Sequence, residues 1–166
     1  NTVTTSFTSV AGQDGYVRES NGTSNVGGST TSNTVLRLGD DYGSATSGER
    51  QDKGFVSFDT STLPDNAVIT SATLKLKASA ITGTNPFTTH GVCHADIKGE
   101  LGFGGSATLA NGDFEAAADA TQVAVMSDPA AVGVAAGGVN RGGGGDRLGG
   151  GDAGAAPACH GSTARR

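Results

Sequence analysis

The strongest constraint on the fold is a stretch of alternating side chains over Thr70–Ala78. Leu74 and Leu76 are apolar there, whereas Thr73 and Lys75 are polar. A period of two predicts a β-strand, because successive side chains of a strand point to opposite faces. We therefore expect a strand that turns its two leucines inward and its Thr and Lys side chains toward solvent.

Other short segments, rich in Val, Phe, Tyr, Ile and Thr, also favour strands. They are Thr2–Val10, the end of Asp14–Glu19, Val35–Gly39, Gly54–Asp59, Thr88–Ile97 and Gln122–Met126. The segment Ser20–Thr34 is nearly all Ser, Thr, Asn and Gly and predicts a long polar loop, and a second polar loop is expected just before Gly54. A single helical turn is expected over Asp113–Ala118, with Asp113 near its N-terminus. The pattern predicts an all-β protein, with a jelly-roll-like antiparallel β-sandwich over residues 1–126.

Composition narrows the class of protein further. The chain has 28 Gly, no Trp and a net charge of −5, which is typical of a β-rich extracellular protein and argues against a nucleic-acid partner. It lacks the run of ~18 apolar residues that a membrane span needs, so no membrane insertion is expected. No leader is visible before Asn1, which suits a mature form or an excised domain. We expect a secreted or cell-surface protein of unknown oligomeric state.

Residues 127–166 differ in character from the rest of the chain. They contain 12 Gly and 9 Ala but no Phe, Tyr, Trp or Ile. Such a segment buries too little apolar surface to offset the entropy of ordering its backbone. We expect a low-complexity, disordered tail that follows the folded part of the chain.

Five segments of the body resemble one known family. They are Asp14–Glu19, Ser24–Ser29, Leu36–Asp40, Gly54–Pro64 and Val68–Leu76. In this order they resemble the DNRLRE / disaggregatase-related β-sandwich modules, which are similar to carbohydrate-binding module family 96, over roughly residues 6–125. The resemblance implies a jelly-roll domain attached to a secreted prokaryotic protein or polysaccharide-degrading enzyme.

The end of the chain departs from that family pattern. Further apolar and aromatic strands are expected where the Gly- and Ala-rich tail stands. A shifted reading frame of GC-rich DNA would encode such a tail, so we hypothesise a frameshift or truncation near residues 126–140. The sandwich would then lack closing strands and have open edges, which invite pairing with other chains. Sequencing the parent gene tests this hypothesis.

Five residues are candidates for binding a sugar polymer. Sugars are commonly held by aromatic faces together with polar side chains. The candidates are Tyr16, Arg18, Glu19, Arg37 and Tyr42. The two arginines favour an acidic polysaccharide over a neutral one, and each tyrosine has packing at the sandwich edge as its alternative role.

The densest group of reactive side chains is His90, His94 and Asp96, with Cys93 between them. On a strand, the two histidines and Asp96 share one face, but the histidines lie ~13 Å apart along it, too far to chelate one ion. On a helix they would be four residues apart and able to bind zinc. These three residues are the candidates for a catalytic role, with an incidental structural role as the alternative. Cys93 and Cys159 can form one disulfide at most.

No cofactor is certain from the sequence, and a structural calcium ion is one candidate. Asp40 and Asp41 are expected in a turn after a strand, where carboxylates and a backbone carbonyl suit this oxygen-seeking ion. Three functions stay open: a non-catalytic polysaccharide-binding or surface-attachment module, a small secreted glycoside hydrolase or lyase, and a structural spacer.

Overall fold

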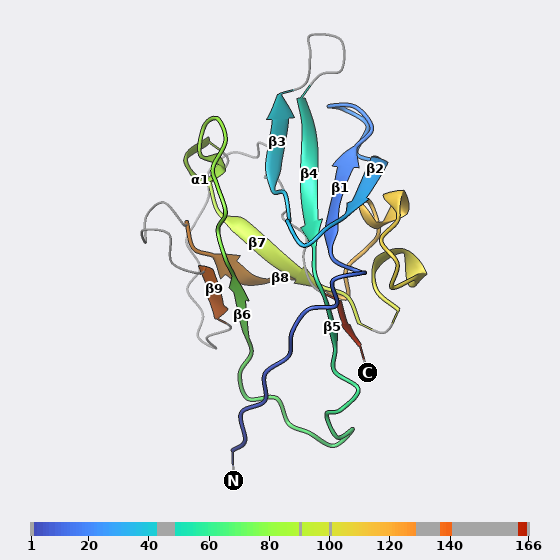
Figure 1. Ribbon diagram of the computed structural model, residues 1–166, viewed down its shortest axis with the longest axis vertical. Coiled ribbons are helices and arrows are strands. Elements are labelled where there is room, and N and C mark those ends of the chain that lie inside the picture. Colours follow the sequence, from blue (N-terminus) through green and yellow to red (C-terminus); the bar gives the residue numbers. More distant parts are fainter. Residues whose placement is uncertain are drawn as a thin grey trace.

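The protein is described by a computed structural model, shown in Figure 1, that covers residues 2–42, 49–89, 91–99, 101–128, 137–140 and 163–165. Most of its regular structure is antiparallel β-strand. In these ranges helix is confined to the single turn α1 (Pro86–Thr89) and to the 3-10 turns η1 (Phe103–Gly105) and η2 (Asn111–Asp113). The all-β class predicted from the sequence is confirmed, whereas the jelly-roll connectivity stays a prediction.

The largest sheet has four strands in the order β2-β1-β4-β3, and every neighbouring pair is antiparallel. The strands are β1 (Gly15–Glu19), β2 (Gly27–Ser32), β3 (Gly39–Tyr42) and β4 (Glu49–Phe55). In the central pair, Tyr16 lies opposite Gly54, Val17 opposite Lys53 and Arg18 opposite Asp52. This register decides which side chains share a face of the sheet.

The remaining strands form three separate pairs. They are β5 (Ser57–Asp59), β6 (Thr73–Leu76), β7 (Cys93–Ile97), β8 (Ala120–Met126), β9 (Gly137–Asn140) and β10 (Thr163–Arg165). The pairs β7–β8 and β6–β9 are antiparallel, whereas β5–β10 is parallel. In Figure 1 the four-stranded sheet occupies the upper part of the molecule, and β6 and β9 lie at the lower left.

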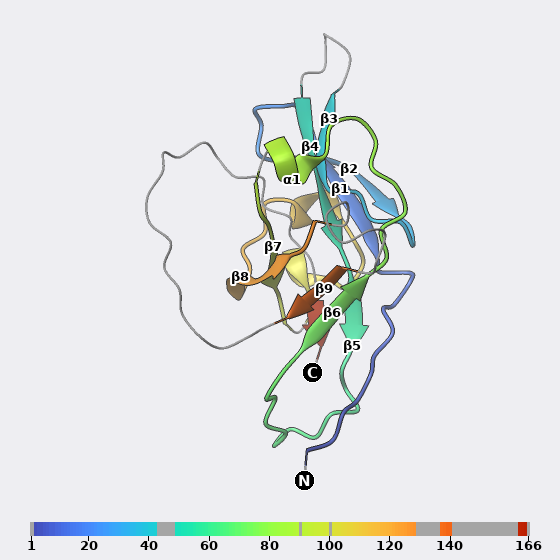
Figure 2. The same ribbon diagram turned by 90° about the vertical axis from the view of Figure 1, so that its left-hand side faces the viewer.

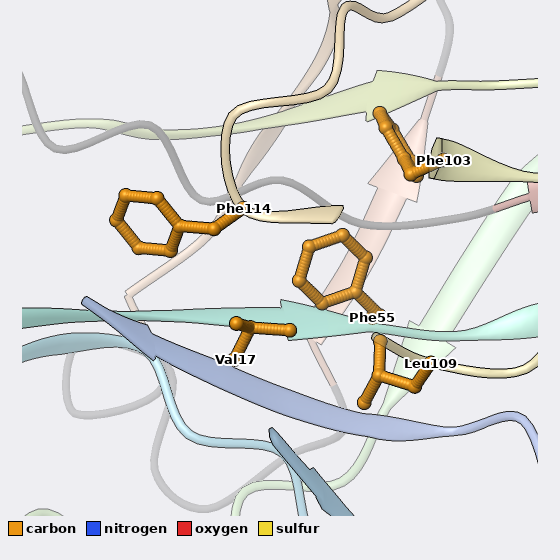
Figure 3. Close-up of a cluster of buried hydrophobic side chains, with 5 residues drawn as sticks. All are labelled: Val17, Phe55, Phe103, Leu109 and Phe114. Carbon is orange, nitrogen blue, oxygen red and sulfur yellow. The ribbon is translucent and has the colours of Figure 1, made fainter. Parts of the chain in front are cut away.

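A small apolar core covers one face of the four-stranded sheet (Figure 3). Val17 of β1 and Phe55 of β4 contribute from the sheet, and Phe103, Leu109 and Phe114 close over them from the segment that carries η1 and η2. The rings of Phe55 and Phe103 meet edge to face with centroids 5.5 Å apart. Each such side chain stabilises the fold by roughly 2–3 kcal/mol through burial alone. We call this face of the sheet the inner face and the opposite one the outer face.

Two predicted loops contain strands. The polar segment Ser20–Thr34 includes β2, and the loop expected before Gly54 contains the start of β4. Both expectations were wrong because backbone hydrogen bonds to β1 and β3, rather than an apolar pattern, make these segments strands. The strand predicted over Val35–Gly39 lies later in the chain, since β3 begins only at Gly39.

Smaller differences between prediction and structure concern the bounds of single elements. The expected strand Thr2–Val10 makes one isolated bridge, Ser9 to Phe58, and the segment Thr88–Ile97 begins in α1 and becomes strand only at Cys93. The helical turn expected at Asp113–Ala118 lies earlier, at η2. The alternation in β6 is confirmed, because its leucines are half-buried and its Thr and Lys side chains are exposed.

Within the tail, the structure describes only β9 and β10, so the disorder predicted for the other tail residues lies outside the described ranges, as does Cys159. Cys93, at the start of β7, is disulfide-bonded. In the part of the chain that is described, no helix is long and apolar enough to cross a membrane.

Candidate functional site

The outer face of the four-stranded sheet carries polar and aromatic side chains where the inner face carries the core. Val17 of β1 is fully buried, so its neighbours Tyr16 and Arg18 point the other way. Both are half-buried on the outer face. The β-strand period therefore brings an aromatic ring and a guanidinium, which belong to two of the predicted binding residues, to one surface.

Arg18 is held by a paired carboxylate on the adjacent strand. Its Nε and Nη2 donate to Oδ1 and Oδ2 of Asp52 at 2.8 and 2.9 Å, and the two residues lie directly opposite in the register of β1 and β4. This bidentate pairing fixes the side chain of Arg18 and satisfies both charges. Asp52 was missed by the sequence analysis, although counting back in twos from Gly54 places it on the outer face.

Arg37 reaches the same surface from outside the sheet. Its Cζ lies 5.2 Å from the centroid of the Tyr16 ring, within the range of an attractive cation–π contact. The guanidinium is exposed and forms no ion pair with any residue in the described ranges. It is therefore the cation of this surface with the most freedom to meet a ligand.

The connection between β2 and β3 places Arg37 there by crossing the outer face of β4, as Figure 1 shows. The crossing depends on Gly54, because a Cβ at this position would meet Leu38 Cδ2 at 2.9 Å and the carbonyl oxygen of Arg37 at 3.3 Å. A side chain at residue 54 would push the connection away from the sheet. The glycine thus helps to set the position of Arg37 relative to Tyr16.

Hydroxyl groups extend this surface along β2. Thr31 lies opposite Tyr16 and Ser29 opposite Arg18 in the antiparallel register, so their side chains share the outer face. We call Tyr16, Arg18, Ser29, Thr31 and Arg37 the outer-face site. It combines one aromatic ring, the guanidinium of Arg37, which forms no ion pair with a described residue, and hydroxyls that can exchange hydrogen bonds with a polar ligand.

Glu19 and Tyr42, the other two predicted binding residues, do not join this group in the described structure. Glu19 is buried on the inner face, where its carboxylate accepts from the backbone N–H of Asn25 at 2.6 Å and of Gln51 at 3.3 Å. It stabilises the turn between β1 and β2. Tyr42 ends β3, and its side chain lies outside what the structure describes.

The predicted calcium residues lie in a strand rather than in a turn. Asp40 and Asp41 belong to β3 and pair with Gln51 and Arg50. The side chain of Asp41 lies outside what the structure describes, so a calcium site at these two residues stays a prediction. The expectation of a turn was wrong because β4 extends back to Glu49 and pairs with this segment. Among the described residues, no three His, Cys, Asp or Glu side chains are grouped to hold a metal.

The predicted catalytic group is only partly described. His90 lies outside the described residues, His94 is half-buried in β7, and Asp96 is buried. Asp96 Oδ1 accepts from the backbone N–H of Gln122 at 2.7 Å, next to the irregular register between Ala95 and Ile97. Gln122 has a φ of 52°, an unfavourable conformation for a side chain of its kind. Asp96 therefore holds the strained start of β8.

The inner face contains a buried lysine that the sequence analysis missed. Lys53 Nζ donates to the carbonyl oxygen of Phe114 at 2.7 Å and lies 3.9 Å from the centroid of its ring. Burial lowers the pKa of Lys53 to about 8, although the charges of Asp96, Glu19 and Glu115 act in the opposite direction. Alternation from Phe55 would have placed Lys53 on the inner face.

Asp113, the last residue of η2, is a second buried charged residue. Its Oδ2 accepts from the backbone N–H of Ala110 at 2.7 Å, whereas no partner reaches Oδ1 in the described structure. Burial is the main cause that raises the pKa of Asp113. Its carboxylate also requires Gly104, where a Cβ would lie 2.5 Å from Oδ1. These inner-face groups act in folding, since the core and the η2 turn enclose them.

Comparison with family models, with curated proteins and with solved structures finds no match for this chain.

Proposed function

We propose that the outer-face site binds a polysaccharide that carries acidic groups, and that the chain is a non-catalytic polysaccharide-binding or surface-attachment module of a secreted protein. The observation that carries this proposal is the exposed guanidinium of Arg37 above the ring of Tyr16. The two groups lie beside the hydroxyl-bearing strand β2.

The chemistry of each group supports this ligand class. A planar guanidinium forms two parallel hydrogen bonds with a carboxylate or a sulfate. Because Arg18 is already paired with Asp52, the ligand charge is expected to meet Arg37. The hydroxyls of Ser29 and Thr31 suit the hydroxyl groups of a sugar.

The disulfide at Cys93 supports the proposed location of the protein. Disulfides persist mainly in oxidising compartments, which include the bacterial periplasm and the extracellular space. A secreted or cell-surface protein would also meet polysaccharides directly.

Affinity electrophoresis tests the proposal. The full chain would migrate through gels that contain polygalacturonate, an acidic polymer, or dextran, a neutral one. We expect retardation only by the acidic polymer and weaker retardation at high salt, because screening reduces exposed charge pairs. Arg37→Gln should weaken binding at least about tenfold, as expected for the loss of one charge-assisted bidentate contact.

A matched control variant distinguishes binding at this site from a general effect of the protein's net charge. Lys75→Gln removes one positive charge from an exposed position of β6 and should leave retardation unchanged. Equal weakening by both variants, or no retardation by any acidic polymer, contradicts the proposal and favours a structural spacer. New reducing ends in a parallel assay would instead favour a polysaccharide-active enzyme.

A further inference from the structure

The segment before β6 is an apolar part of the surface that the outer-face site does not use. Val68 and Ile69 are 86% and 61% exposed, and Val68–Ala72 belongs to no helix, turn or strand. It runs directly into β6 at the lower end of the molecule, away from the four-stranded sheet (Figure 1 and Figure 2).

Among the described residues, this segment and one edge of β6 have no strand partner. β6 pairs only with β9 in a sheet of two strands, so one edge of β6 faces no strand in the described ranges. None of the described residues pairs with Val68–Ala72. Exposed apolar edges of this kind are templates for a further strand.

We propose that Val68–Leu76 pairs antiparallel with the same segment of a second copy of this chain, about a two-fold axis at Ala72. This axis places Val68 opposite Leu76, and Thr70 opposite Leu74, on one face of the joint sheet. All these side chains are apolar except that of Thr70. A two-fold contact needs such a self-complementary surface, since each residue meets its partner twice.

The positions of the lysines also favour the register with its axis at Ala72. On the other face, Lys75 lies opposite Ile69 of the second copy, so no two lysines meet. An axis at Lys75 would place that residue against itself, and an axis at Leu76 would place Lys75 against Lys77. Like charges directly opposite one another destabilise a strand pair. The axis at Ala72 therefore joins apolar positions and keeps the lysines apart.

Two substitutions at Ile69 test the register. Both introduce a charge at an exposed position, so both should leave the fold of one copy intact. Ile69→Lys sets two like charges against Lys75 in each dimer, and the dimer dissociation constant should rise about tenfold. Ile69→Glu sets opposite charges there and should keep or tighten the dimer. The double variant Ile69→Lys/Lys75→Glu should restore it.

The measurement is sedimentation equilibrium of the full chain over a wide concentration range. We expect the wild type to approach the mass of a dimer and then to stay there. Leu101→Lys is the control, because Leu101 is 60% exposed in another part of the surface, and it should leave the dimer unchanged. A wild type that stays monomeric, a mass that keeps rising beyond a dimer, or equal weakening by Ile69→Lys and Ile69→Glu would overturn the proposal.

Discussion

The two faces of strands β1 and β4 have different roles. Alternate residues of the same strands form the core on one face and a polar surface on the other. The inner face turns Val17, Lys53 and Phe55 into the core under the η1 and η2 turns. The outer face carries Tyr16, which lies under Arg37, and the ion pair of Arg18 with Asp52. One face stabilises the fold, and the other presents polar groups that can meet a ligand.

The cations of the two faces show the difference most clearly. Arg18 is paired with a carboxylate through two short hydrogen bonds, whereas Lys53 bonds to a carbonyl oxygen and lies over a ring. A neutral acceptor compensates less of the desolvation of a charge than a carboxylate does. The pKa of Lys53 consequently falls to about 8 through burial. The partner that each face provides therefore differs, with a carboxylate for Arg18 and a carbonyl oxygen for Lys53.

The largest expected loss of stability comes from a substitution in the core on the inner face. Phe103 is 2% exposed and packs edge to face on Phe55, so Phe103→Ala should lower the free energy of unfolding by about 3–5 kcal/mol. Urea denaturation followed by circular dichroism measures this loss. Val92→Ala, at a side chain that is 54% exposed, is the control and should change stability by less than about 0.5 kcal/mol. Similar losses for both variants would mean that the apolar cluster is not the core.

The next largest loss of stability is expected when the ion pair on the outer face is removed. Arg18→Ala leaves the carboxylate of Asp52 without its partner, and the side chain of Asp52 is only 7% exposed. We expect a loss of about 3 kcal/mol from the free energy of unfolding. Arg18→Ala/Asp52→Ala should lose clearly less than the sum of the two single variants, because the pair acts as a unit. Additive losses in this double-mutant cycle would show that the two side chains do not interact in solution.

The smallest expected effect is a pH dependence of stability that comes from Lys53 on the inner face. The folded-state pKa of Lys53 is lowered to about 8 from 10.5, so the unfolded chain binds more protons between these values. The free energy of unfolding should therefore rise with pH in this window, by on the order of 1 kcal/mol between pH 8 and 10. Denaturation at several pH values measures the slope. Lys53→Met should remove this contribution, and an equal slope in both proteins would contradict the assignment.

Much of the local structure could be predicted from the sequence. Alternation in β6 correctly predicted which side chains are half-buried and which are exposed, because that pattern depends only on the backbone period. The same period explains why Tyr16 and Arg18 share a face, although the sequence analysis only grouped them as candidates for binding. The strand β2 could not be predicted in this way, because its Gly, Ser and Thr residues carry no apolar signal and depend on hydrogen bonds to β1.

Three members of the outer-face site, Tyr16, Arg18 and Arg37, were named from the sequence, whereas Ser29, Thr31 and the geometry of the site were not. Arg37 lies 21 residues after Tyr16 in the sequence, and no local pattern shows that the intervening chain returns across Gly54 to place the guanidinium above the ring. The same holds for Asp52, which meets Arg18 only in the register of β1 and β4. Such contacts depend on which strands pair, and pairing is a property of the whole sheet.

The sequence by itself determined the all-β class, the alternation of faces along individual strands and the residue types available for binding. These follow from side-chain chemistry and from a backbone period that needs only local information. Only the tertiary structure decided that Arg37 covers Tyr16, that Glu19 and Lys53 are buried, and that the segment before β6 pairs with none of the described residues. Those outcomes depend on strand register and on the packing of distant segments, where one residue of shift exchanges the two faces.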